Sequence, residues 1–189
     1  MQPREVDTPQ DFGAWALAQA CAFFISGLAN VGLNVGYERN YFETKDPQRR
    51  LSLLYTAVLF VLLAQTTAGI ATWFFSADIS RLVIGSADRA DLVFWAYCAA
   101  ALTSLKLYYL TYLKNQEDAA GFVRYTIDET VLGTIISLVL VAVCGIGIIG
   151  VVWAQAIASG GVLAVLVVRT ARSQPPVLDL AAFRACLVI

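Results

Sequence analysis

The chain contains no histidine among its 189 residues. Histidine is the commonest metal ligand and the usual acid–base residue at neutral pH, so its absence argues against most metal sites and against histidine-based catalysis. The four cysteines stand singly and form no CxxC or zinc-ligand spacing, and we expect them to be small buried side chains. No nucleophile or nucleotide-binding loop stands out either. The sequence therefore predicts neither an enzyme nor a bound cofactor.

Charge is also scarce. Charged residues make up 14% of the chain and the formal net charge is -1, so no bulk charge points to nucleic acid. Hydrophobic residues make up 59%, and the mean hydropathy is +0.68. Soluble domains contain about 45–50% apolar residues. This composition indicates a protein that works within a membrane.

Five apolar blocks fill most of the chain, and each is long enough to cross the hydrocarbon core, which takes about 20 residues in a helix. They comprise residues 14–36, 51–75, 92–113, 122–144 and 150–168. The glycine-rich residues 145–149 permit a tight hairpin between the last two. We therefore expect an all-α, polytopic membrane helix bundle within residues 1–173. Residues 174–189 read as a cytoplasmic linker and the first turns of a further, truncated helix.

Basic residues are concentrated in alternate connections. One side carries eight of them: Arg39, Lys45, Arg49, Arg50, Lys114, Arg124, Arg169 and Arg172. The other side carries three: Arg4, Arg81 and Arg89. The positive-inside rule places the first set in the cytoplasm and the N-terminus outside. Residues 1–11 lack the basic start of a signal peptide, so an outward N-terminus suggests that a preceding helix is missing.

Two of the apolar blocks, the first and the third, contain polar side chains well inside them. Gln19, Ser26, Asn30 and Asn34 recur in the first block at steps of seven and four residues, near one helical face that continues to Glu38. Such a stripe should face other helices or water, because polar groups facing lipid are costly. Either interhelical hydrogen bonds or the lining of a cavity would satisfy it.

Lys106 is a cation well inside the third block. An ammonium at mid-membrane costs about 2.5–3.5 kcal/mol on the insertion scale. Snorkelling and pairing would reduce this cost, and Glu129 of the fourth block lies at about the same depth, counted from the shared loop. Alternatively, Lys106 could contact the phosphates of a substrate, for which an ammonium is a suitable point charge.

Three stretches, in order, resemble one family. VDTPQDFG at residues 6–13 is similar to the beginning of the second helix of bacterial polysaccharide flippases. GLNVGYERNYF at residues 32–42, which contains Arg39, resembles the end of that helix. GIGIIGVVWAQ at residues 145–155 resembles the hairpin between the fifth and sixth helices. The family is the oligosaccharide-lipid flippase branch of the multidrug/oligosaccharidyl-lipid/polysaccharide exporter superfamily.

The resemblance implies a two-lobed helix bundle around a central cavity. The complete protein would flip an undecaprenyl-type lipid-linked oligosaccharide across the inner (cytoplasmic) membrane by alternating access, in polysaccharide or lipopolysaccharide biosynthesis. This chain would supply about helices two to six of the N-terminal lobe, with a second lobe or partner subunit elsewhere. The candidate substrate-binding residues are Lys106, Asn30, Asn34, Gln19, Arg39 and Glu129.

Two other functions stay open at this point. One is a multidrug or metabolite exporter of the same superfamily, whose cavity should be more apolar and carry carboxylates for cation coupling. The other is a non-transporting membrane subunit or scaffold of a polysaccharide synthesis complex.

Overall fold

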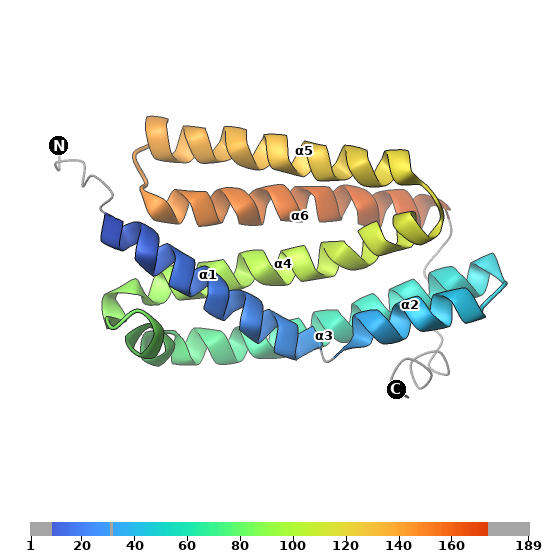
Figure 1. The fold of residues 1–189 in the computed structure, drawn as a ribbon, viewed down its shortest axis with the longest axis horizontal. Helices are drawn as coiled ribbons and strands as arrows, with labels where there is room; N and C mark the ends of the chain where they lie inside the picture. Colours follow the sequence, from blue (N-terminus) through green and yellow to red (C-terminus); the bar gives the residue numbers. More distant parts are fainter. Residues whose placement is uncertain (1–8, 31, 174–189) are drawn as a thin grey trace.

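The computed structural model describes residues 9–30 and 32–173, and every regular element in these residues is helical (Figure 1). The elements are α1 (Pro9–Asn30), α2 (Leu33–Glu43), α3 (Pro47–Val83), the short η1 (Ala87–Arg89), α4 (Ala90–Asn115), α5 (Ala119–Leu138), the π-helical η2 (Val139–Val143) and α6 (Ile148–Ser173). Five helical stretches are long and apolar enough to cross a membrane. The predicted all-α class is confirmed for these residues. The predicted linker and truncated helix at 174–189 lie outside them.

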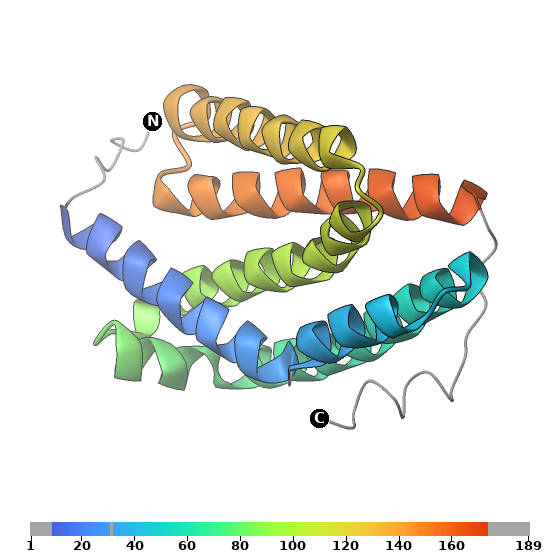
Figure 2. The same ribbon diagram turned by 45° about the vertical axis from the view of Figure 1, so that its right-hand side comes forward.

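The long helices run back and forth between two ends of the molecule (Figures 1 and 2). α4 lies in the middle and packs against α1, α3 and α6, whereas α5 packs mainly against α6. The N-terminus of α1 and the α3–α4 and α5–α6 connections lie at one end. The other end, which we call the basic end, holds the α2–α3 and α4–α5 connections and the C-terminus of α6. It carries all eight of the cations that the charge pattern assigned to the cytoplasm.

The first apolar block is not one helix, and the prediction of a continuous span over residues 14–36 is wrong. α1 ends at Asn30, and α2 starts at Leu33. Between them Gly32 takes a φ of 70°, a left-handed conformation that glycine adopts at little cost. The break lets α2 lie beside the first part of α3 and bury Tyr37 and Tyr41. The polar stripe of this block is therefore split between two helix axes.

α3 is much longer than the apolar block that predicted it. It begins four residues earlier, at Pro47, where the Asp46 side chain accepts a hydrogen bond from the backbone of Gln48 at 3.0 Å. It continues to Val83, and Gly85 with a φ of 88° follows. Its 37 residues make a helix of about 56 Å, longer than the hydrocarbon core of about 30 Å. The hydropathy boundary at residue 75 thus marks where the apolar surface ends, while the helix itself continues.

The predicted tight connection between α5 and α6 is confirmed. Gly145 and Gly147 have φ values of 66° and 73°, which favour glycine. The α-helix gives way to the π-helical turn Val139–Val143 just before this connection, which hydropathy did not predict. A Cβ on Gly150 would lie 3.1 Å from the Cβ of Leu140, so the glycine permits this close approach.

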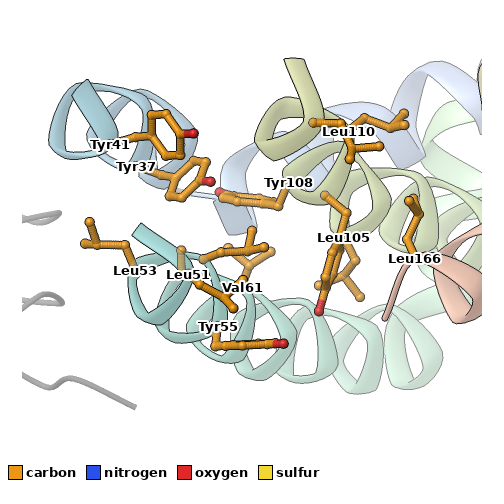
Figure 3. Packing of buried hydrophobic residues seen from close by; sticks show 14 of the residues in the cluster. Tyr37, Tyr41, Leu51, Leu53, Tyr55, Val61, Leu105, Tyr108, Leu110 and Leu166 are labelled. Atoms are coloured by element: carbon orange, nitrogen blue, oxygen red, sulfur yellow. The ribbon is translucent and has the colours of Figure 1, made fainter. Parts of the chain in front are cut away.

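Two clusters form the core. One, towards the basic end, joins α2, α3, α4 and α6, and Figure 3 shows Tyr37 and Tyr108 pointing toward one another within it. Their ring centroids are 6.0 Å apart, within the range of favourable aromatic pairs. The second cluster lies between alanine-rich faces of α1 and α4 and includes residues of α6. Together they fix α4 and α6 in position, and these helices supply two sides of the site.

Candidate functional site

Lys106 of α4 and Glu129 of α5 form an ion pair in the interior of the helix bundle, as their matching depth predicted. The pair joins Lys106 Nζ to Glu129 Oε1. Only 6% of the Lys106 side chain is exposed, and 21% of that of Glu129. Charges this far from water need a partner, because removing an unpaired ion from water costs several kcal/mol. Each group therefore supplies the partner that the other needs in this position.

Two hydroxyl side chains extend the ion pair into a network across three helices. Ser159 of α6 donates its Oγ hydrogen to Glu129 Oε1 at 2.6 Å. Thr103 of α4 lies 3.2 Å from Ser159, oxygen to oxygen, and donates to the carbonyl of Ala99 at 2.9 Å. Ser159 is fully buried. We call Thr103, Lys106, Glu129 and Ser159 the charged network.

The short α4–α5 connection places Lys106 and Glu129 side by side. Lys106 lies nine residues before the end of α4 at Asn115, and Glu129 lies ten residues after the start of α5 at Ala119. Glu117 turns the chain with a φ of 63°, and the Asp118 side chain caps α5 by accepting from the backbone of Gly121 at 2.9 Å. Both charged groups are therefore about 14 Å along their helices from the basic end.

A groove of about 430 Å³ lies beside the charged network, between α5 and α6. Its lining includes Glu129 but not Lys106, and five of the nine lining residues are polar: Glu129, Thr130, Thr134, Ser137 and Gln155. Thr130 and Thr134 each donate to the carbonyl four residues earlier, at 2.9 and 2.8 Å. Their oxygens stay available as acceptors, so the groove can bind a polar ligand without breaking the helix.

This groove lies on a face that the rest of the described chain leaves open. In the apolar window of the α5 span, no residue is buried. α5 packs against α6 along one side and contacts α4 less extensively. A carboxylate and several hydroxyls are thus exposed on a helix that is otherwise apolar enough to face lipid. Such groups inside a membrane normally face a cavity or another helix.

The polar stripe of the first block does not form one site. Gln19 donates to Gln155 Oε1 of α6 at 2.9 Å, which places it behind the groove. Asn30 accepts from the Tyr108 hydroxyl of α4. Asn34 has a buried Oδ1 with no hydrogen-bond partner among the described residues. The residues of the stripe therefore contact different helices, and Gln19 and Asn30 form hydrogen bonds between helices.

Ser26 of the same stripe has a contact of its own. Gln65 of α3, only 3% exposed, donates to the Ser26 side chain at 2.9 Å and accepts from the Tyr97 hydroxyl at 2.8 Å. These bonds join α1, α3 and α4. Three neighbouring helices are thus held by one buried amide, which is a packing role.

Arg39 lies apart from the charged network. It is exposed on α2 and pairs with Glu43 of the same helix at 3.2 Å, N to O. An exposed pair of this kind contributes roughly 0.3–0.5 kcal/mol. The structure therefore brings together Lys106 and Glu129, connects Gln19 to the groove through Gln155, and places Asn30, Asn34 and Arg39 elsewhere.

Ser159 and Gln155 are not among the candidate residues predicted from the sequence. They lie four residues apart, on one face of α6, and both now border Glu129 or its groove. Thr130, Thr134 and Ser137 were not singled out. Their spacing of four and three residues from Thr130 onward, next to Glu129, was the signal that could have found them.

Nothing in the described residues groups three or more His, Cys, Asp or Glu side chains in a way that could hold a metal ion. Outside the spans, burial raises the pKa of the Tyr41 hydroxyl, and the nearby Arg50 guanidinium offsets part of that rise. Arg50 lies over the Tyr41 ring at 4.7 Å from the centroid.

Comparisons of this chain with protein-family models, with curated proteins and with solved structures give no match.

Proposed function

We propose that this chain is part of a membrane transporter that moves a lipid-linked oligosaccharide across the cytoplasmic membrane by alternating access. The observation that carries the proposal is a buried ion pair, Lys106–Glu129, beside an open groove with polar walls, on helices apolar enough to span a membrane. A purely structural bundle gains little from such a pair, because well-packed apolar side chains are often as stable. Ionisable groups inside a membrane by default suggest a transport path.

The substrate class follows from the charges. A lipid-linked sugar has apolar chains, a phosphate or pyrophosphate, and many hydroxyls. Lys106 would neutralise the phosphate during passage, and Glu129 holds the ammonium when no substrate is present. The hydroxyl and amide groups of Thr130, Thr134 and Gln155 would bind the sugar. Substrate binding would thus exchange one partner of Lys106 for another, which couples binding to a movement of α4 relative to α5.

A second lobe or a partner subunit would cover the groove. In transporters built from repeats, substrate sites lie between the halves. α5 makes its main contacts with α6, and it contributes no buried residue within its apolar window. A facing lobe would convert the groove into the central cavity of the complete transporter.

One observation favours a second candidate. Glu129 lines the groove, whereas Lys106 lies behind it. A carboxylate at the wall suits a cationic substrate or coupling ion, as in a multidrug or metabolite exporter. The two candidates differ in which member of the ion pair meets the substrate.

Transport in membrane vesicles from native cells, with the gene intact or deleted, tests the proposal. The translocated lipid-linked sugar is scored by a membrane-impermeant lectin, and efflux of a cationic dye is measured in the same vesicles. We expect deletion to abolish sugar translocation and to leave dye efflux unchanged. Loss of dye efflux alone would favour the exporter. Normal rates of both would indicate a non-transporting subunit.

The orientation gives a separate prediction. Lys45 and Asp88 are exposed. Lys45 lies in the α2–α3 connection and Asp88 in η1 of the α3–α4 connection, and these two connections lie at opposite ends of the bundle. In a background without the native cysteines, Asp88→Cys should react with an impermeant thiol reagent in intact cells. Lys45→Cys should react only after permeabilisation, because the basic end faces the cytoplasm. Labelling of position 45 in intact cells would reverse the orientation.

A further inference from the structure

A second cavity, of about 310 Å³, lies at the basic end, where α3 begins and α4 and α6 end. Its walls include leucines from all three helices. Its polar groups come from Tyr109, Tyr112 and Gln116 of α4 and from Arg169 and Thr170 of α6. This size is at the lower limit of small-molecule sites, about 300–1,000 Å³. It suits a headgroup better than an oligosaccharide, and no residue is shared with the groove between α5 and α6.

Tyr109 contributes a hydroxyl to the lining of the cavity. Its side chain is only 3% exposed, so the ring is held in place by the surrounding helices. An acceptor that enters the cavity would receive a hydrogen bond from this hydroxyl.

Arg169 supplies a cation whose charge is only loosely matched. Half of its side chain is exposed, and Nη2 lies 3.3 Å from Asp118 Oδ2, while Nη1 lies 3.4 Å from the Tyr125 hydroxyl. Both contacts are longer than the usual 2.7–3.2 Å. The guanidinium can therefore accept a stronger anionic partner without losing a tight one.

The surroundings add positive charge. Arg50 acts electrostatically on Tyr112, at the edge of the cavity, and forms no ion pair with a carboxylate in the described part of the chain. Asp118 opposes an anion, but it already faces Arg169. Arginine and tyrosine at the end of spanning helices lie at the level of lipid headgroups. Basic pockets between helices on the cytoplasmic side are suited to anionic headgroups.

We propose that this cavity binds the headgroup of an anionic glycerophospholipid from the adjacent leaflet. Arg169 holds the phosphodiester, and the Tyr109 and Tyr112 hydroxyls and the Gln116 amide donate hydrogen bonds to the phosphate and to headgroup hydroxyls. The site is separate from the transport path and holds whether or not the chain transports a lipid-linked sugar.

Native mass spectrometry of the purified chain in detergent tests this site. Phosphatidylglycerol and phosphatidylcholine are titrated separately, because they share a phosphodiester and differ in net charge. We expect one phosphatidylglycerol to remain bound at collision energies that remove phosphatidylcholine. Arg169→Gln should weaken phosphatidylglycerol binding about tenfold, as expected for the loss of one charge-assisted hydrogen-bonding group. Tyr109→Phe should weaken it severalfold without changing any charge.

Arg172→Gln is the matched control, since Arg172 is exposed on the same helix and does not line the cavity. It should bind phosphatidylglycerol within about twofold of the unchanged chain, because a single rim charge contributes little. Equal losses in Arg169→Gln and Arg172→Gln would overturn the site in favour of diffuse surface attraction. Full displacement of the lipid by millimolar inorganic phosphate would overturn the lipid as the ligand. Helicity by circular dichroism shows whether each variant is folded. If Arg169→Gln does not fold, the loss of phosphatidylglycerol binding in Tyr109→Phe still tests the site.

Discussion

Replacement of Lys106 by methionine should destabilise the bundle by about 3 kcal/mol, because Glu129 would be left without its cation. This is the lower end of the range for broken buried ion pairs, and Glu129 keeps 21% of its side chain exposed. The loss should appear as a lower midpoint of unfolding in a mixed-micelle titration with a denaturing detergent. Methionine keeps most of the lysine volume, so the result reports on charge rather than on a cavity.

The double variant Lys106→Met, Glu129→Gln should recover most of this stability. It removes both charges, and the glutamine amide oxygen can still accept from Ser159. Replacement of both members of a buried pair is often neutral, whereas removal of one is costly. Lys114→Met is the matched control. Lys114 lies on the same helix as Lys106 but pairs with Glu38 of α2 at the surface, at 2.7 Å, and the loss of this pair should cost under about 1 kcal/mol. Equal losses of stability in Lys106→Met and Lys114→Met would mean that the interior ion pair contributes no more to stability than the surface pair.

The largest functional effect is expected from Lys106→Ala, which should abolish export of the lipid-linked sugar. The phosphate of the substrate would then cross the low-dielectric interior without a counter-charge. Lys106→Arg should retain part of the activity, because the charge survives while its shape and reach change. Export is measured as surface polysaccharide in native cells, with the amount of protein in the membrane measured in the same cells.

The control for this prediction is Lys114→Ala, which should export normally at equal protein level. Normal export with Lys106→Ala would reduce Lys106 to a structural residue. The groove residues Gln155 and Thr134 would then be the better candidates for contact with substrate.

The ion pair could be predicted from the sequence because the geometry that sets it is local. α4 and α5 are antiparallel and joined by a three-residue turn, so counting residues from the turn gives equal depth. An ammonium and a carboxylate at equal depth in an apolar environment have few other partners. The same reasoning could not reach Ser159, because the position of α6 depends on packing between distant segments.

The break between α1 and α2 could not be predicted in the same way. Hydropathy continues unchanged across residues 30–33, and glycines are common inside spanning helices. Gly32 is left-handed because α2 must turn to bury Tyr37 and Tyr41 against α4. Tertiary contacts, rather than local hydropathy, therefore determine where the helix breaks. The hydropathy pattern likewise fixed the apolar part of α3 but not its polar extension to Val83.

The open groove was missed for a third reason. Thr126, Thr130 and Thr134 donate to carbonyls of their own helix, so they look satisfied in isolation. Only the three-dimensional arrangement shows that one face of α5 has no neighbour within the described chain.

Export by the double variant Lys106→Met, Glu129→Gln is the most direct test of the central claim. This variant should be nearly as stable as the unchanged chain and should reach the membrane in equal amounts, yet export no lipid-linked sugar. Stability and transport would then be separated at a single ion pair. Normal export by a variant without either charge would contradict the account and leave Lys106 and Glu129 as a packing device.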